Sequence, residues 1–210
     1  MKSGVSSSGI WPQEIRFFPK DLSLLSPISA KILEFPGGQV PSWSSSYPGC
    51  GIYVCTGPGP ILGRIGGQVY ALKPRDLVLI PPGAPVCWFA EKSPSRLLAV
   101  YFLPSIMIVD MSSRELSSFL AAFRFGREER LKVRSLDREN YDLIHRNFQA
   151  LREARQDGTA EQGLKGKVFL GQILLETLES STEGQASGAS VWAEQAWQRL
   201  PKVLDYLHKN

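Results

Sequence analysis

Residues 66–85 have the sequence GGQVYALKPRDLVLIPPGAP. Two short apolar runs, 69–72 and 77–80, are separated by residues 73–76 and followed by the turn residues 81–83. Four residues are too few to repay the cost of nucleating a helix, and proline and glycine at the borders are typical of turns. The stretch therefore predicts two buried strands of an all-β layer, joined by a turn.

Similar apolar segments, cut by glycine and proline, continue on both sides of this stretch. Their spacing, with turn signals such as Gly37-Gly38 and Gly66-Gly67, predicts seven or eight strands within residues 15–111. This arrangement is typical of a β-barrel or jelly roll. The expected strands are residues 28–35, 52–55, 61–65, 69–72, 77–80, 86–90 and 97–103.

From Ser112 onward the pattern changes to amphipathic helices. Ser112 with Glu115 forms a capping box, Asp137 can cap a second helix, and Thr159 with Gln162 repeats the capping-box spacing before a third. Residues 112–180 are therefore expected to be helical, which makes the chain α+β with three to four C-terminal helices. The apolar stripes are Leu116, Phe119, Leu120 and Phe123, then Tyr141, Ile144, Phe148 and Leu151, then Leu164, Val168, Gly171, Leu175 and Leu178.

The two ends of the chain differ from its body. Residues 1–14 are expected to be a disordered tail, and residues 181–190 a flexible linker rich in serine and glycine. Residues 191–210 carry an apolar helical face beyond that linker. A lone amphipathic helix needs an apolar partner, so it either packs back on the body or begins a domain that continues past Asn210. Its face consists of Leu200, Val203, Leu204 and Leu207.

Charge and composition exclude several classes of protein. The 24 basic and 20 acidic residues give a net charge of +4, which does not indicate a nucleic-acid-binding surface. Three cysteines without a secretory leader are typical of reduced thiols in the cytoplasm. No apolar run approaches the roughly 18 residues of a membrane span. We therefore expect a soluble, cytoplasmic protein with no membrane partner.

The opening stretch also resembles a known motif. From Asp76 to Val86 the spacing is that of the second cupin motif, in which Pro81 and Gly83 precede a metal-ligand position. With LAVYFLP at residues 98–104, this region resembles the N-terminal sensor domain of AraC-type transcription regulators. The ending VLDYLHKN is similar to the first helix of their helix-turn-helix domain.

The resemblance implies a cupin-like barrel over residues 15–111 that senses a small organic effector. It further implies that the helices of residues 112–180 form a homodimer interface. Residues 191–210 would then be the first helix of an incomplete helix-turn-helix domain, and DNA would be bound only through the part missing after Asn210.

The sequence departs from the cupin metal motifs. Arg75 stands at the turn-glycine position and Val86 at the histidine position, while Cys50 stands at the glutamate position of the first motif. Its histidine positions fall on or near Ser44 and Ser46. Metal sites need converging imidazole or carboxylate donors. We therefore expect no metal, no cofactor, no catalytic residue and no enzymatic activity.

Three residues are expected to bind the effector. Trp88 shares the strand face of Val86, Cys50 is expected to point inward on the same logic, and Tyr101 is a candidate from the last strand. An apolar cavity lined by aromatic rings suits a small organic molecule. The alternative is that these residues fill a closed core.

The second helical stripe, Tyr141, Ile144, Phe148 and Leu151, contacts either its own barrel or a second protomer. The resemblance favours a contribution to a dimer. Two other functions stay open: a stand-alone cupin protein that binds a small molecule, and a cupin enzyme.

Overall fold

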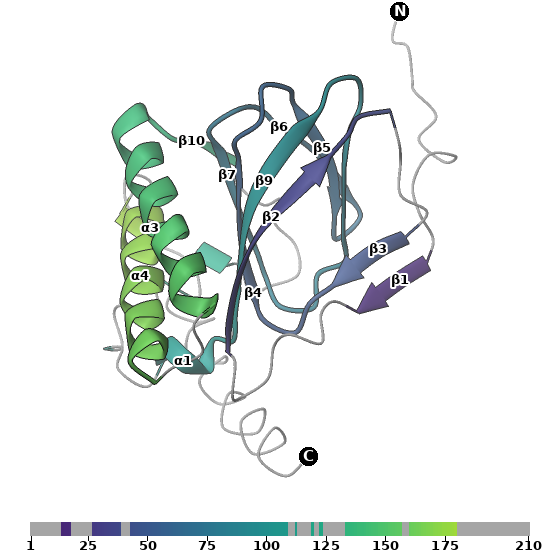
Figure 1. Cartoon of the computed structure of the whole chain (residues 1–210). Helices are drawn as coiled ribbons and strands as arrows, with labels where there is room; N and C mark the ends of the chain where they lie inside the picture. The colour runs from purple at the N-terminus through teal and green to yellow at the C-terminus, as the bar shows by residue number, and fades with distance from the viewer. Residues whose placement is uncertain are drawn as a thin grey trace, which may run out of the picture.

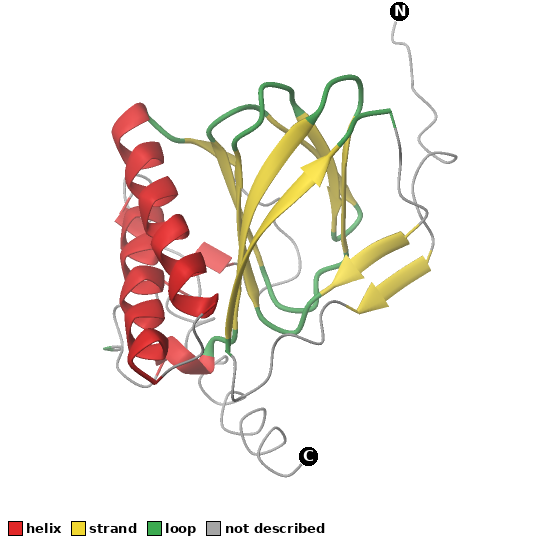
Figure 2. Cartoon of the chain, viewed as in Figure 1, coloured by secondary structure: helices red, strands yellow, loops and turns green. Residues whose placement is uncertain are grey.

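The computed structural model describes residues 14–17, 27–38, 43–108, 112, 119, 122–123, 133–156 and 160–179. In this part of the chain two five-stranded sheets face each other, and two long helices lie against the outer side of one sheet (Figure 1). We call this sheet the helix-facing sheet and the other the outer sheet. Figure 2 shows the resulting order of layers, with helices on one side and the β-sandwich on the other.

The helix-facing sheet has the order β10-β7-β4-β9-β2 and is antiparallel throughout. The outer sheet has the order β1-β3-β8-β5-β6 and is antiparallel except that β1 runs parallel to β3. The strands are β1 Glu14–Phe17, β2 Ile28–Phe35, β3 Trp43–Ser46, β4 Cys50–Cys55, β5 Ile61–Ile65, β6 Gln68–Leu72, β7 Asp76–Ile80, β8 Val86–Ala90, β9 Ser95–Phe102 and β10 Val133–Ser135.

The predicted α+β class, a jelly-roll-like β-domain followed by helices, is confirmed. All seven expected strands are present within two residues of their predicted ends. Strands β1, β3 and β10 were not predicted. They are only three or four residues long, and none has an apolar run that separates it from a loop.

The described helices are α1 Ser105–Ile108, α3 Arg138–Gln156 and α4 Ala160–Glu179. Two of them are long, where we expected three to four. Asp137 caps α3 as predicted, because its carboxylate accepts a 2.8 Å hydrogen bond from the backbone N–H of Asn140. Phe119 and Phe123 have helical backbone and are fully buried. No helix among the described residues has the length and apolar character needed to cross a membrane.

The central strands of the helix-facing sheet, β7, β4 and β9, are buried on both faces. All five residues of β7 are buried: Leu77 and Leu79 belong to the core under the helices, while Val78 and Ile80 belong to the core between the sheets. Successive strand residues point to opposite faces, so a strand covered on both sides reads as a continuous apolar run. The opening stretch is apolar without alternation for this reason.

The stripe predicted for dimerisation packs on its own chain instead. Ile144, Phe148 and Leu151 are no more than 2% exposed and belong to the core beneath the helices, and Tyr141 is packed against that core. Helix α3 lies beside β2 of the same chain. The expectation that Ile144, Phe148 and Leu151 contribute to a dimer is therefore corrected, because their apolar surface already covers the sheet. Tyr141 is only partly buried, and its predicted role in a dimer stays a prediction.

Helix α4 has two apolar faces. Leu170, Ile173 and Leu174 are buried with α3 and the sheet. The stripe picked out from the sequence points the other way, since Leu164, Val168 and Leu175 are more than half exposed. A helix that packs against its own protein on one face only would carry polar residues on this exposed face.

Several expectations fall outside the described residues. These are the tail at residues 1–13, the capping residue Thr159, the linker at 181–190 and the helix expected at 191–210. The predicted domain boundaries stay predictions.

Candidate functional site

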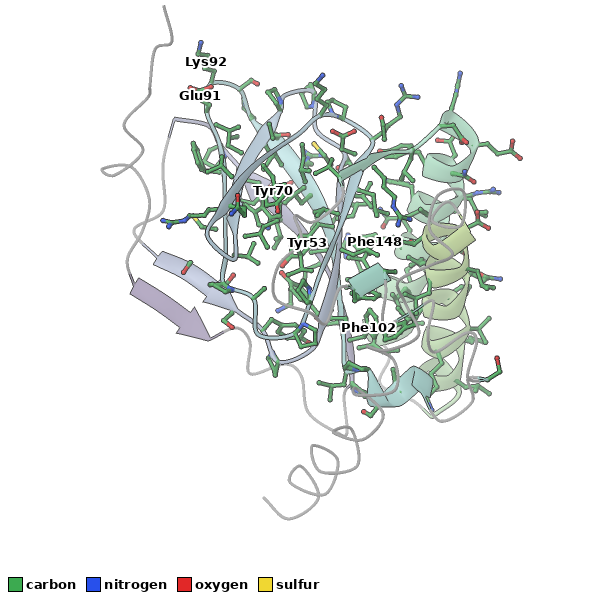
Figure 3. The ribbon with its side chains drawn as sticks, turned by 180° about the vertical axis from the view of Figure 1, so that it is seen from behind. Tyr53, Tyr70, Glu91, Lys92, Phe102 and Phe148 are labelled. Atoms are coloured by element: carbon green, nitrogen blue, oxygen red, sulfur yellow. The ribbon has the colours of Figure 1, made fainter. Side chains whose placement is uncertain are left out.

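Four aromatic side chains lie together between the two sheets: Tyr47, Tyr53, Trp88 and Tyr101. We call them the aromatic cluster. The Tyr101 ring meets Tyr47 edge-on with centroids 4.8 Å apart, and Tyr53 at 5.7 Å. The Trp88 ring lies 5.5 Å from that of Tyr53. Figure 3 shows Tyr53 on the side of the sheet away from Phe148 and the helices. Both sheets and the turn after β3 therefore contribute to the cluster.

The polar atoms of the cluster are only partly hydrogen-bonded. The hydroxyls of Tyr53 and Tyr101 are 3.2 Å apart and share one hydrogen bond. The Tyr47 hydroxyl and the Trp88 indole nitrogen are buried without a protein partner in hydrogen-bonding geometry. A buried polar group left unpaired costs about 1–3 kcal/mol, and native proteins rarely retain one. Two unpaired donors in one cluster indicate a site at which a ligand with a hydrogen-bond acceptor would bind favourably.

The cluster lies at the edge of the core between the sheets. Tyr47, Trp88 and Tyr101 are 6–7% exposed, whereas every other buried member of this core is 3% exposed or less. The turn beside Tyr47 is held in place because the backbone N–H of Gly83 donates a 2.6 Å hydrogen bond to the Tyr47 carbonyl. The three rings are therefore the most solvent-exposed of the buried members of this core.

Glycines make room for the rings. Gly63 pairs with Trp88 across β5 and β8, and a Cβ atom at Gly63 would overlap the indole ring. A Cβ atom at Gly51 would lie 2.9 Å from the Tyr53 ring, closer than ordinary van der Waals contact. A glycine inside a strand often marks such a close approach. The two glycines let bulky rings lie where the backbone would otherwise carry side chains.

The electrostatic environment keeps the cluster neutral. Burial raises the pKa of Tyr47, Tyr53 and Tyr101 above its usual value, and neighbouring tyrosines raise the pKa of Tyr47 and Tyr53 further. The nearby indole N–H of Trp88 acts in the opposite direction on the pKa of Tyr53, although the two groups do not meet hydrogen-bond geometry. All three phenols are therefore protonated at neutral pH and can donate as well as accept hydrogen bonds.

The structure supports the predicted orientation of two ligand residues and corrects the third. Trp88 and Tyr101 point into the core between the sheets, and Trp88 shares the face of Val86 as expected. Cys50 does not point inward, because it belongs to the core under the helices. On strand β4 the inward residues are Tyr53 and Cys55. The predicted binding roles of Trp88 and Tyr101 stay predictions.

The positions of the cupin metal motifs do not gather donors. Val86 is a buried apolar residue in the interior, and Cys50 lies on the other face of its sheet. Among the described residues no group of three His, Cys, Asp or Glu side chains is placed to hold a metal ion. His145, half-buried on α3, lies beside the Tyr141 ring.

The three cysteines are free, buried and separate. Cys50 lies under the helices and Cys55 between the sheets, while Cys87 is adjacent in β8 to the inward-pointing Trp88 and so points to the opposite face. Burial raises the pKa of all three thiols. Their thiols are therefore protonated at neutral pH, and the thiolate is the reactive form of cysteine.

The turn-glycine position of the second cupin motif shows why a glycine would fit there. Arg75 has a φ of 73°, in the left-handed region that glycine enters without steric cost. Its backbone is fixed on both sides, since its N–H donates to the Cys55 carbonyl at 2.8 Å and its carbonyl accepts from Leu136 at 3.0 Å. The turn geometry of the motif is therefore present although the glycine is not.

The fold and the site define a jelly-roll-like β-protein with a helical cover and a neutral aromatic cluster inside. No family model matches the chain, and no curated protein matches it. Among solved structures, ToxT from Vibrio cholerae matches 79% of this chain at 8% identity and a TM-score of 0.44. The chain spans 61% of that ToxT chain.

A cupin superfamily protein from Desulfitobacterium hafniense matches 40% of this chain and 73% of its own, at 19% identity and a TM-score of 0.34. A further structure of ToxT, bound to an unsaturated fatty acid, matches 75% of this chain and 55% of its own, at 9% identity and a TM-score of 0.44. At these identities and TM-scores, the similarities place no functional residue in this chain.

Sequence reasoning missed Tyr47, Tyr53 and Gly63. Gly63 carried a usable signal, because it interrupts the predicted strand 61–65 and a glycine there often marks a close approach. Tyr53 was missed because the inward face of β4 was assigned from Cys50. Tyr47 had no signal, because β3 was not predicted.

Proposed function

We propose that this chain is the sensor and dimerisation part of an AraC-type transcription regulator. In this proposal a small organic effector binds at the aromatic cluster and leaves chemically unchanged. The proposal rests on the sequence resemblance at residues 76–86, 98–104 and 203–210 and on the site described above.

One observation carries the binding function: two buried donors in one aromatic cluster lack a partner. Neither the Tyr47 hydroxyl nor the Trp88 indole nitrogen has one among the protein atoms. These two donors are not needed for packing, because phenylalanine in both places would fill the core without the cost of burying unpaired polar groups. A ligand that accepts hydrogen bonds removes this cost when it binds.

The test is a thermal-shift screen of small organic molecules, with native mass spectrometry of the purified protein to detect a co-purified compound. A bound ligand raises the melting temperature by mass action. We expect compounds that stabilise the natural protein but not the Trp88→Leu variant.

Phe148→Leu is the matched control, because it truncates a buried ring under the helices and leaves the aromatic cluster intact. A stabilising compound should act on this control as on the natural protein. Compounds that stabilise all three proteins equally, or a complete absence of hits and of co-purified molecules, would refute the binding function.

The homodimer of this proposal is placed on the outer face of α4. Leu164, Val168 and Leu175 expose apolar surface there, and Gly171 lies between them on the same face, where a small residue allows close approach. In an antiparallel pair centred on Gly171, Val168 lies opposite Leu175 of the second copy. A twofold interface pairs the same patch with itself, which suits this stripe.

Charge supports a second copy as the occupant of this face. Lys165 and Glu176 lie on the same flank of the α4 stripe, on either side of Gly171. In the antiparallel pair each lysine therefore lies across from the partner's glutamate. Opposite charges at the border of an apolar interface favour one orientation over its alternatives.

The dimer is tested by light scattering after size-exclusion chromatography. Val168→Glu should convert the dimer to a monomer, because it buries a charge in the apolar stripe. Val69→Glu is the matched control, since Val69 is similarly exposed but lies on β6. A monomeric natural protein, or a Val168→Glu variant that stays dimeric, would exclude a second copy as the occupant.

The DNA-binding part of the proposal concerns residues 191–210, which lie outside the described residues. In the AraC-type arrangement they begin a helix-turn-helix domain, and most DNA contacts come from the rest of that domain. We therefore expect no sequence-specific binding by residues 191–210 on their own. Specific retardation of DNA in a gel shift that persists at raised salt would contradict it.

A further inference from the structure

Three hydrogen-bond donors of the aromatic cluster are not paired with an acceptor of the protein. Tyr53 and Tyr101 hold two hydroxyl hydrogens but share a single hydrogen bond, so one hydrogen is left to donate. The Tyr47 hydroxyl and the Trp88 indole N–H bring the number of available donors to three. The indole N–H can only donate. A ligand that satisfies this cluster must therefore present an acceptor atom.

Among the described residues no lysine or arginine is buried, and the buried acidic side chain, Asp76, lies on the same face of β7 as Val78 and Ile80 of the core between the sheets. An anion bound there would be buried without a counter-charge, and burying an unpaired charge is far more costly than burying a dipole. The acceptor is therefore better supplied by a neutral oxygen than by a carboxylate or phosphate.

A cation is disfavoured by how the rings pack. Aromatic residues bind a cation over an open ring face. Here the rings cover one another, since Tyr101 meets Tyr47 and Tyr53 edge-to-face at interplanar angles of 62° and 85°. The available donors also present positive hydrogens to any ligand. The same core also contains apolar side chains, including Ile61, Ile65 and Leu97.

We propose, on the basis of the function proposed above, that the site binds an uncharged molecule with an aromatic or apolar body and one neutral oxygen acceptor. Its oxygen accepts a hydrogen bond from the Trp88 indole N–H, from the Tyr47 hydroxyl or from both. The body lies against the rings of Tyr47, Trp88 and Tyr101, the most solvent-exposed of the buried members of this core.

Four probes of similar size separate the alternatives. Acetophenone carries a neutral oxygen, α-methylstyrene has the same shape without the oxygen, benzoate is an anion, and phenyltrimethylammonium is a cation. The readout is the indole N–H signals of protein labelled with nitrogen-15 at its five tryptophans. The Trp88 signal is the one missing from the Trp88→Phe variant.

We expect acetophenone to move the Trp88 signal to lower field in a saturable titration. α-Methylstyrene should bind at least about tenfold more weakly than acetophenone, as measured by the same Trp88 signal, because it leaves the donors unpaired. A fall of about three- to tenfold in affinity for acetophenone in the Tyr47→Phe variant would place the oxygen at Tyr47 as well as at Trp88, and an unchanged affinity would place it at Trp88 alone. Circular dichroism and urea unfolding report that this variant is folded.

Tighter binding of benzoate or phenyltrimethylammonium at Trp88 would overturn the ligand class and leave the sensor function standing. Equal binding of acetophenone and α-methylstyrene would overturn the role of the donors. If none of the four probes moves the Trp88 signal, the proposed class is wrong, and the thermal-shift screen then decides the sensor function separately.

Discussion

Replacing Gly63 with alanine tests whether the aromatic cluster is built as described. The new Cβ atom would overlap the Trp88 ring, so the indole must move or the strands must separate. Overpacking of this kind typically costs about 1–3 kcal/mol, and alanine in a strand otherwise gains roughly 0.5–1 kcal/mol over glycine. Because the overlap involves the rigid ring itself, we expect a net loss of about 2 kcal/mol of unfolding free energy. For a chain of this length the melting temperature falls by roughly 4–8 °C.

The assay is urea unfolding followed by tryptophan fluorescence and circular dichroism. Gly163→Ala is the matched control, because a Cβ atom at Gly163 meets nothing within 4 Å. In that helix the change should stabilise the protein by up to about 1 kcal/mol.

A double-mutant cycle then isolates the contact with the ring. In a Trp88→Leu background the Gly63→Ala change should be neutral or stabilising, which gives a coupling energy of about 2 kcal/mol. A Gly63→Ala protein as stable as the natural one, or a loss that persists without the indole, would refute the packing argument.

Three further outcomes are expected. Arg75→Gly should raise the unfolding free energy by about 0.5–1 kcal/mol, because it relieves a left-handed backbone at φ 73°; urea midpoints that fall would contradict it. Phe148→Ala should cost about 3–5 kcal/mol in the same assay, as its ring is 1% exposed under the helices. Burial raises the pKa of Cys50 and Tyr53 above the ordinary values of 9.0 and 10.0. These two groups therefore lose their protons at a lower pH in the unfolded chain than in the folded one. Stability should therefore be complete below pH 9 and fall as the pH rises further, and a urea midpoint constant from pH 8 to 11 would count against this.

The fold could be predicted because turns and apolar runs carry most of the information. Proline and glycine at residues 57–60, 66–67 and 81–83 separate the strands wherever the chain reverses. Asp137 marks the start of α3, since its carboxylate side chain is suited to the free N–H groups there. Short strands without an apolar run, such as Trp43–Ser46, are held by pairing with distant segments, and a local pattern does not report that.

The direction of side chains was harder to predict, for a related reason. In a strand with one solvent-exposed face, alternating polar and apolar residues show which side chains point inward. Strand β4, however, is buried on both faces from Cys50 to Cys55. Without a polar residue to set the alternation, a shift of one position exchanges the two faces completely. The motif spacing placed Cys50 inside, whereas Tyr53 is inside.

The sequence also did not show which apolar helix stripe packs against the sheet and which is exposed. Ile144, Phe148 and α4 residues such as Leu164 all look like one kind of apolar stripe in the sequence. The sheet has an outer face that must be covered, and α3 with the inner side of α4 covers it. Once that need is met, the remaining apolar stripe of α4 has no role within the described chain. An exposed apolar helix face is therefore stronger evidence for a partner than a buried one, and this is why we place the dimer on Val168 and Leu175 and not on α3.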